Sequence, residues 1–214
     1  IDWWGPVIYE YYAMTETGIV AMCDSEQWLA HTGTVGCAAE GVEIRIVSEQ
    51  GEDCPAGTPG QICVSSEVTP YVAYHRAEEK TQDLHMGNYI ATGDVGYLDE
   101  GGFVFISDRI SDMVISGGVN IYPAEIEKVL VSMPVVRDCA VFGIPDKEFG
   151  ERLVSVVETS EPLLGDAVSE YLRERMSGYK VPREILFTDH LPREDSGKIK
   201  KRLLKEAFLA GELG

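Results

Sequence analysis

Short apolar runs, separated by polar turns, dominate the first half of the chain. Val7–Tyr12, Val42–Val47, Gln61–Val64 and Phe103–Ile106 are rich in β-branched and aromatic residues and have the length of strands. The segments between them are rich in Gly, Pro and acidic residues, which favour turns. This pattern predicts a small β-barrel or sandwich from Gly41 to Arg109, with a separate strand before it at Val7–Tyr12.

The second half mixes helical and strand patterns. Pro123–Val131 begins with Pro and carries acidic residues in its early turns, which predicts a helix. Met113–Ser116 has the pattern of a short strand before a Gly-Gly turn. Further strands are expected near 135–144, 152–158 and 184–188, with helices near 166–176 and 200–209. Residues 112–214 are therefore expected to form a compact α+β module.

Composition and charge narrow the possible functions. The 214 residues include 44% hydrophobic and 25% charged residues, which is typical of a folded protein. The formal net charge of −18 argues against a nucleic-acid or anionic-membrane partner, because such partners need a basic face. A small anion such as a nucleotide can still bind where a few cations or a metal ion act locally.

The five cysteines and four histidines do not form a metal-binding pattern. No two cysteines have the CxxC spacing, and no two histidines stand at a helical i, i+4 spacing. Reduced thiols and a cytoplasmic location are therefore expected. No apolar run reaches the roughly 18 residues of a membrane span, and no signal peptide opens the chain. The abrupt start at Ile1 leads us to expect a piece of a longer protein.

Tyr12–Glu16 combines an aromatic ring, a hydroxyl and a carboxylate at the end of a predicted strand. Such groups can stack on a base, bond a phosphate oxygen and help to hold Mg²⁺. The alternative is an ordinary strand followed by a capped turn. Thr92–Asp94 places a carboxylate beside a glycine, where it could accept two hydrogen bonds from a ribose, or could serve the turn alone.

Three further segments have both a functional and a purely structural interpretation. Asp108-Arg109 could bring a guanidinium to a sugar or phosphate, or could be a surface ion pair. Ser116–Asn120 contains two glycines that would allow a ligand to approach the backbone, or would simply form a hairpin turn. Ser196–Lys198 is not a phosphate-binding loop of the GxxxxGK type, but its lysine could reach a phosphate, or could belong to an exposed basic helix face.

Taken in order, these segments resemble the adenylate-forming superfamily, which includes acyl-CoA synthetases, luciferases and nonribosomal peptide adenylation domains. The matching motifs are Tyr12–Glu16, Thr92–Asp94, Asp108–Glu127 and Leu191–Lys198. The third is long and specific. The resemblance implies an α+β protein with a barrel-like end of the large adenylating domain in residues 1–108, a hinge at 109–111, and a small C-terminal lid domain in residues 112–214.

The same resemblance implies roles for individual residues. The nucleotide-binding residues would be Tyr12 on the adenine, Thr15 on the α-phosphate, and Asp94 and Arg109 on the ribose, while Glu16 would help to hold Mg²⁺. Lys198 would be the catalytic lysine that stabilises charge during adenylation. The Gly117-Gly118 loop would line the CoA channel after rotation of the lid. Ser111 stands at the hinge, where the family usually has Asp or Lys.

The implied activity is an ATP-dependent acid:CoA ligase that forms an acyl-adenylate and then acyl-CoA, of the fatty-acid or steroid-side-chain type. Its substrates would be a carboxylic acid, ATP and CoA, with Mg²⁺ and possible homo-oligomerisation. One alternative is an adenylation domain that loads a carrier protein. The other is a non-catalytic fragment, because the family's phosphate loop and upstream subdomains should precede Ile1 and the isolated 214 residues are expected to be inactive.

Overall fold

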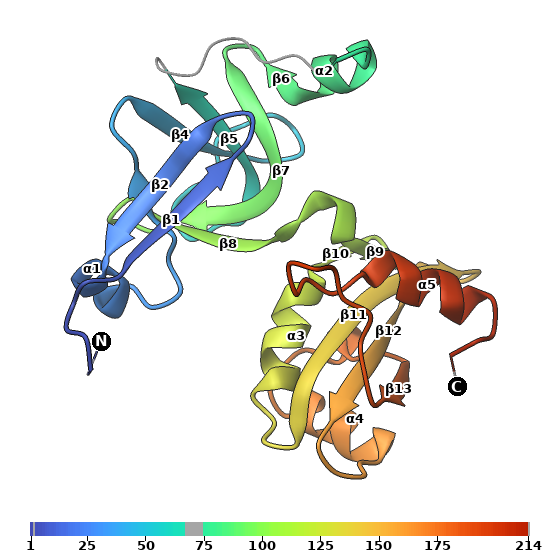
Figure 1. The fold of residues 1–214 in the computed structure, drawn as a ribbon. Helices are drawn as coiled ribbons and strands as arrows, with labels where there is room; N and C mark the ends of the chain where they lie inside the picture. The colour runs from blue at the N-terminus through green and yellow to red at the C-terminus, as the bar shows by residue number, and fades with distance from the viewer. Residues whose placement is uncertain (2, 67–74, 214) are drawn as a thin grey trace. The chain divides into compact units, whose positions relative to one another are not determined.

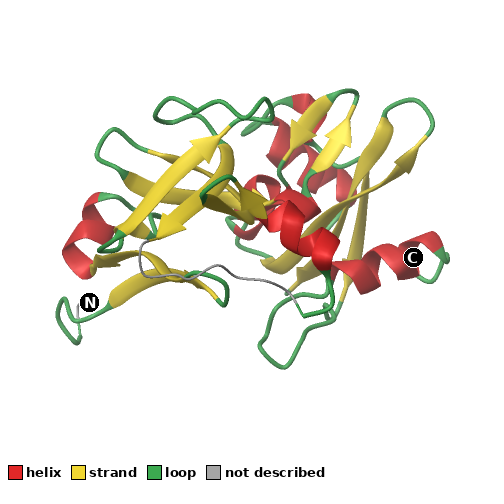
Figure 2. Cartoon of the chain, turned by 90° about the horizontal axis from the view of Figure 1, so that it is seen from above, coloured by secondary structure: helices red, strands yellow, loops and turns green. Residues whose placement is uncertain are grey.

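The computed structural model describes residues 1, 3–66 and 75–213. The chain divides into two compact units, Ile1–Ile110 and Ser111–Gly214, which we describe separately (Figure 1). Figure 2, coloured by secondary structure, shows that strands form the body of each unit and that the helices flank them.

Unit 1 is built on an eight-stranded sheet in which all strand pairs are antiparallel. Its order is β1-β2-β3-β8-β7-β5-β4, and β6 pairs with β7. The strands are β1 (Tyr9–Met14), β2 (Gly18–Asp24), β3 (Gly36–Ala38), β4 (Val42–Val47), β5 (Gly60–Ser66), β6 (His85–Met86), β7 (Tyr89–Leu98) and β8 (Phe103–Arg109). Within the described residues, no ladder joins β1 to β4, so the sheet is not a closed barrel.

The described residues of unit 1 form two clusters of buried side chains. Tyr12, Val20, Ile46, Ile62 and Val104 belong to one cluster of buried side chains, contributed by five different strands. Val47 and Cys63, next to Ile46 and Ile62, belong to the second cluster, and because successive strand residues point to opposite faces, β4 and β5 carry buried side chains on both faces. Two short helices, α1 (Ser25–Ala30) and α2 (Glu78–Leu84), complete the unit. The sequence pattern had not predicted either helix.

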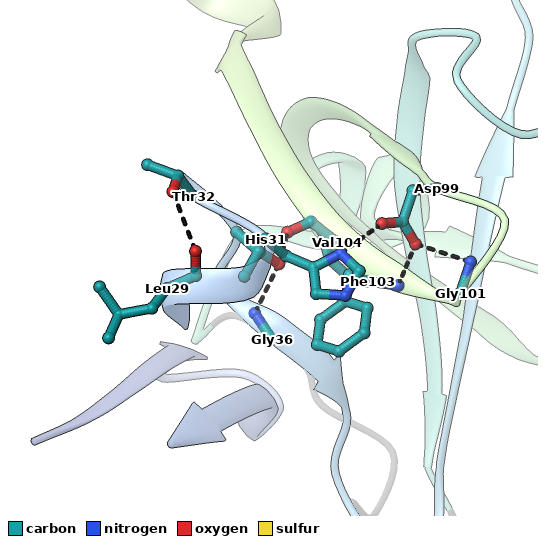
Figure 3. A network of polar contacts seen from close by, with 9 residues as sticks. Leu29, His31, Thr32, Gly36, Asp99, Gly101, Phe103 and Val104 are labelled. Atoms are coloured by element: carbon teal, nitrogen blue, oxygen red, sulfur yellow. Dashed lines mark hydrogen bonds and ion pairs between the residues drawn. The ribbon is translucent and has the colours of Figure 1, made fainter. Parts of the chain in front are cut away.

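The turn between β7 and β8 is fixed by Asp99 (Figure 3). Asp99 Oδ1 accepts hydrogen bonds from the backbone N–H groups of Gly101 and Phe103, each at 2.9 Å. Its other oxygen lies 2.9 Å from His31 Nδ1, and the His31 ring stacks on Phe103. Burial acts to raise the pKa of Asp99, but the bonds from Phe103, His31 and Gly101 outweigh it, and the pKa is lowered. This turn sets the register of β7 and β8.

Unit 2 contains a five-stranded mixed sheet of order β10-β9-β12-β11, with β13 parallel to β12. The strands are β9 (Val114–Ser116), β10 (Val119–Ile121), β11 (Val136–Asp146), β12 (Gly150–Thr159) and β13 (Glu184–Thr188). The helices are α3 (Pro123–Val131), α4 (Gly165–Arg173) and α5 (Lys201–Leu209), with 3-10 turns at Ile110–Asp112 and Gly178–Lys180. All the strands and helices that the sequence predicted for this half are present, within a few residues.

Both faces of the unit 2 sheet are covered. Val141 of β11 packs in one buried cluster with Ile126 of α3 and Leu172 of α4. The neighbouring Phe142 packs in a second cluster with Leu204 of α5. Because successive strand residues point to opposite faces, this arrangement explains why β11 is apolar without interruption in its middle. The α+β class expected from the sequence is confirmed for the chain.

No helix in residues 1, 3–66 and 75–213 combines the length and apolar character that a membrane crossing would require.

Candidate functional site

Three of the residues singled out by sequence meet in unit 1. Tyr12 Oη donates a hydrogen bond to Asp94 Oδ2 at 2.5 Å. Arg109 Nε lies 3.2 Å from the other carboxylate oxygen, Asp94 Oδ1. The second contact follows from strand pairing, since Asp94 of β7 stands directly opposite Arg109 of β8. The structure therefore joins β1, β7 and β8 through one carboxylate.

The carboxylate is buried, and its two partners differ in exposure. Tyr12 is 9% exposed and Asp94 is 6% exposed, whereas the side chain of Arg109 is 60% exposed. Burial, followed by the hydrogen bond to Asp94, raises the pKa of the Tyr12 phenol far above its ordinary value. Tyr12 is therefore a neutral donor to Asp94 throughout the physiological range. The guanidinium has room to contact a ligand as well.

The backbone of Asp94 is fixed by Thr92. Thr92 Oγ1 accepts from the Asp94 N–H at 3.1 Å and donates to the carbonyl of Ile62 at 3.0 Å. Between them, Gly93 has a φ of 77°, a left-handed conformation that favours glycine. Thr92–Asp94 lies inside the ten-residue strand β7. It does not lie in a tight turn, which is what the sequence had suggested. The role of the Thr92 hydroxyl was not foreseen.

Thr15 and Glu16 lie in the short turn between β1 and β2. Thr15 is exposed and Glu16 is half-buried. Within the part of the chain that the structure describes, no group of three or more His, Cys, Asp or Glu side chains could hold a metal ion. Glu16 fits Mg²⁺ only as a single carboxylate beside a phosphate-bearing ligand, which is a common way of binding this ion.

Lys198 of unit 2 lies on a tight hairpin turn. The N–H of Glu194 donates to the Lys198 carbonyl, and the N–H of Gly197 donates to the Glu194 carbonyl, both at 2.8 Å. Gly197 has a φ of 87°, which permits this turn. Lys198 is exposed, and among the described residues no ion pair within 4.0 Å holds its ammonium group.

The neighbouring cations of α5 differ from Lys198, because they are paired. Lys201 Nζ lies 2.8 Å from Glu127 Oε1, and Lys205 Nζ lies 3.8 Å from Glu151 Oε1. These pairs connect α5 to α3 and to β12. The interpretation of this segment as one uniform basic face therefore fails for Lys201 and Lys205, whereas Lys198 and Lys200 have no ion pair within 4.0 Å among the described residues.

Gly117 and Gly118 form the turn of the β9–β10 hairpin, with φ values of 58° and 80°. The Gly117 N–H donates to the carbonyl of Phe149 at 2.8 Å. A Cβ at Gly117 would lie 3.4 Å from the Phe149 ring, which is ordinary van der Waals contact, so the positive φ is what favours glycine here. Ser111, the predicted hinge residue, is exposed and is the first residue of unit 2.

A cavity of about 620 Å³ opens beside this hairpin, within unit 2. Its lining includes two aromatic rings and three arginines: Phe149, Tyr179, Arg152, Arg173 and Arg183. The Arg183 guanidinium lies 4.2 Å from the centroid of the Phe149 ring. The cavity thus combines cations and aromatic faces, which suit a phosphate and a base.

Sequence reasoning missed this cavity. Its arginines come from β12, from the end of α4 and from the loop before β13, so they form no cluster in the sequence. The only readable signal was the local segment Lys180–Arg183, which places two cations around an apolar pair. Nothing in that segment indicates which way its side chains turn.

Each of the two units matches a known protein family. Residues 2–71 match the family described as AMP-binding enzyme, and residues 125–198 match the AMP-binding enzyme C-terminal domain. The chain is 33% identical over 205 residues to the long-chain-fatty-acid–CoA ligase FadD13 of Mycobacterium tuberculosis, covering 95% of this chain and 40% of that protein. It is 36% identical over 204 residues to the 2-succinylbenzoate–CoA ligase of Bacillus cereus, covering 94% and 42%.

The chain also resembles a solved structure. The o-succinylbenzoate CoA synthetase MenE of Bacillus subtilis, in complex with ATP and a magnesium ion, superposes with a TM-score of 0.82 at 34% sequence identity. The match covers 92% of this chain and 41% of that one. The chain therefore spans less than half the length of the relatives it matches.

Proposed function

The chain belongs to the adenylate-forming superfamily, and from this premise we propose that the protein containing it is an AMP-forming acid:CoA ligase. In the first half-reaction, a carboxylate oxygen attacks the α-phosphorus of ATP, and pyrophosphate leaves. In the second, the CoA thiol attacks the acyl carbon, a thioester forms, and AMP leaves. The observation that carries this proposal is the buried Asp94 carboxylate, which Tyr12 and Arg109 hold from two other strands.

The nucleotide site belongs to unit 1. Asp94 can accept hydrogen bonds from ribose hydroxyls, and the exposed guanidinium of Arg109 can reach the sugar or a phosphate. Tyr12 borders the same place, although only 9% of it is exposed, so any stacking on adenine is limited to a small part of the ring. Thr15 is assigned to the α-phosphate, and Glu16 would help to hold Mg²⁺ together with the phosphates of ATP.

Lys198 is assigned to the first half-reaction. Its ammonium group would lie between the attacking carboxylate and the α-phosphate and would offset their mutual repulsion as negative charge moves onto the phosphate oxygens. Its exposure, and the absence of an ion pair to it among the described residues, support this role. A cation already bound to a carboxylate would have to lose that partner first.

Residues 109–111 are assigned to a hinge, with Ser111 as its pivot, between the end of the large AMP-binding domain and the C-terminal lid domain. The division of the chain after Ile110 supports this assignment. In the proposed cycle the lid presents Lys198 for adenylation and the Gly117-Gly118 loop for thioester formation. Glycines suit the second task, because a pantetheine chain can approach a backbone that has no Cβ.

CoA is the acceptor that the cavity of unit 2 favours. The 3′-phospho-ADP end of CoA carries phosphates and an adenine, and Arg173, Arg183 and the rings of Phe149 and Tyr179 offer matching groups. Gly117 lines the same cavity, which would bring the thiol-bearing chain along the glycine loop. A carrier protein presents a phosphopantetheine arm without this nucleotide, so the cavity favours CoA over a carrier protein.

The acid is proposed to be of the fatty-acid or steroid-side-chain class. The isolated 214 residues are expected to be inactive, because they span less than half the length of the relatives they match. Self-association is also expected for the isolated chain, since large apolar side chains such as Trp3, Trp4 and Tyr11 are more than half exposed.

The test is ATP–pyrophosphate exchange by the complete protein, with a panel of fatty, aromatic and steroid-derived acids. Acid-dependent exchange, followed by thioester formation with free CoA, is the expected result. Exchange without any acyl transfer to CoA, combined with transfer to a phosphopantetheinylated carrier protein, would favour the adenylation-domain alternative. Absence of exchange with every acid would contradict the proposed function.

A further inference from the structure

The Tyr12 hydroxyl is bonded to the very carboxylate that the proposed function assigns to the ribose. The 2.5 Å bond joins two buried groups, and the pKa of Tyr12 is raised, so the phenol keeps its proton. The ring itself lies in the buried core of unit 1, in the same cluster as Val20 and Ile62. The ring therefore serves packing, while the hydroxyl is the part of Tyr12 directed at the site.

We infer that Tyr12 is a positioning residue, whose hydroxyl orients the Asp94 carboxylate so that it can bind both hydroxyls of a ribose at once. This inference rests on the proposed function. An ionised carboxylate has about four acceptor positions, two on each oxygen. Tyr12 Oη takes one position on Oδ2, and Arg109 Nε takes one on Oδ1. One position remains on each oxygen, which matches the two neighbouring hydroxyls of a cis-diol.

The geometry also explains why a hydroxyl donor is needed on the Oδ2 side. Arg109 alone would leave the carboxylate free to rotate about its Cβ–Cγ bond. The two contacts on different oxygens, together with the Thr92 bond to the Asp94 backbone, fix its plane. A ligand then binds a preorganised group and does not have to order it, which favours affinity.

The experiment uses Tyr12→Phe in the complete protein, which keeps the ring and removes only the hydroxyl. Calorimetry measures binding of Mg²⁺-ATP, 2′-deoxy-ATP and 3′-deoxy-ATP, so no acid substrate is required. The unaltered protein should prefer ATP over each deoxy analogue by about tenfold or more. In Tyr12→Phe, ATP should bind about tenfold more weakly, and the preference over the analogues should fall below about threefold. Tyr11→Phe, an exposed neighbour on β1, is the matched control and should behave as the unaltered protein.

A double-mutant cycle with Asp94→Asn tests whether the hydroxyl acts through the carboxylate. Adding Tyr12→Phe to Asp94→Asn should change ATP affinity by less than about twofold. A full tenfold effect in that background, or an unchanged preference for ATP in Tyr12→Phe, would overturn the inference while leaving the proposed function intact.

Should Tyr12→Phe unfold, Thr92→Val replaces it, because it releases the Asp94 backbone and should reduce the same preference. An unchanged preference in Thr92→Val would then overturn the inference. Absence of ATP binding by the unaltered protein would instead contradict the proposed function itself, and this inference with it.

Discussion

The polar side chains assigned to nucleotide binding in unit 1 and to catalysis in unit 2 differ in how they are held in place. In unit 1, Asp94 is 6% exposed and is held by Tyr12, Arg109 and the backbone contact of Thr92. In unit 2, Lys198 is exposed on a five-residue turn, which is held by backbone hydrogen bonds and by Arg193, whose guanidinium donates to the Gly197 carbonyl at 3.0 Å. The Asp94 side chain is held by side chains from two other strands, whereas the Lys198 side chain has no ion pair within 4.0 Å among the described residues.

This difference fits the two proposed tasks. A carboxylate that binds the same sugar in both half-reactions benefits from a fixed orientation, since less freedom is lost when the ligand binds. A lysine that acts in only one half-reaction must be able to leave, and a long exposed side chain without an ion pair can do so at little cost. The contrast leads us to expect that substitutions around Asp94 reduce stability and nucleotide affinity together, whereas substitution of Lys198 reduces only the rate of acyl-adenylate formation.

Lys198→Ala should have the largest effect. In the complete enzyme we expect acyl-adenylate formation to fall by about 100-fold or more, because the variant lacks the ammonium group that is assigned to the phosphate. Thioester formation from preformed acyl-adenylate should change by less than about threefold. Single-turnover assays of each half-reaction measure both, and Lys128→Ala, an exposed lysine on α3, is the control. Equal losses in the two half-reactions would refute the assignment.

Asp94→Ala should affect both stability and binding. We expect ATP affinity to fall by about 10- to 100-fold, and the free energy of unfolding to fall by about 1–3 kcal/mol, because the buried Tyr12 hydroxyl loses its acceptor. Urea unfolding and calorimetry measure the two effects. Asp53→Ala breaks an exposed pair with Arg45 and should cost no more than about 0.5 kcal/mol. A loss of affinity at unchanged stability would remove the contrast with Lys198.

Arg183→Ala should have a smaller effect, confined to the second half-reaction. We expect the KM for CoA to rise about five- to tenfold, because an exposed guanidinium contributes modestly to phosphate binding. The KM for phosphopantetheine, which lacks the nucleotide, should not change. Arg175→Ala is the matched control, since Arg175 pairs with Glu174 and does not line the cavity. Equal effects on both acceptors would exclude a nucleotide contact.

Asp99→Asn should have the smallest effect, on the pH dependence of stability. The pKa of Asp99 is below its ordinary value of 3.8, so its contribution to stability is present above about pH 4 and is lost as the pH falls through the folded-state pKa. The variant should therefore lose less stability than the unaltered protein between about pH 5 and pH 3. Urea midpoints across this range measure the effect, and Glu100→Gln in the same turn is the charge control. A similar flattening in Glu100→Gln would contradict a specific role for Asp99.

Much of the secondary structure was predictable from sequence. The helix at Pro123–Val131 has the predicted bounds, because the proline at its start and its apolar face both predict a helix there. The helix at Ser25–Ala30 was missed, although Asp24 and Gln27 form a capping box that the sequence already contains. β7 was not among the predicted strands, because Gly93 and Gly96 interrupt the pattern of a long strand.

The sequence determined the motifs and their order, the division into a β-rich first half and a mixed α+β second half, and the residue types available for chemistry. These features depend on local pattern and on resemblance. The sequence could not determine that Tyr12 and Asp94, 82 positions apart, share a hydrogen bond, because they lie on β1 and β7, which are not neighbours in the sheet order. Nor could it show that Lys201 pairs with Glu127 while Lys198 has no ion pair within the part of the chain that the structure describes. Burial and pairing depend on contacts between distant segments, and only the tertiary structure fixes those contacts.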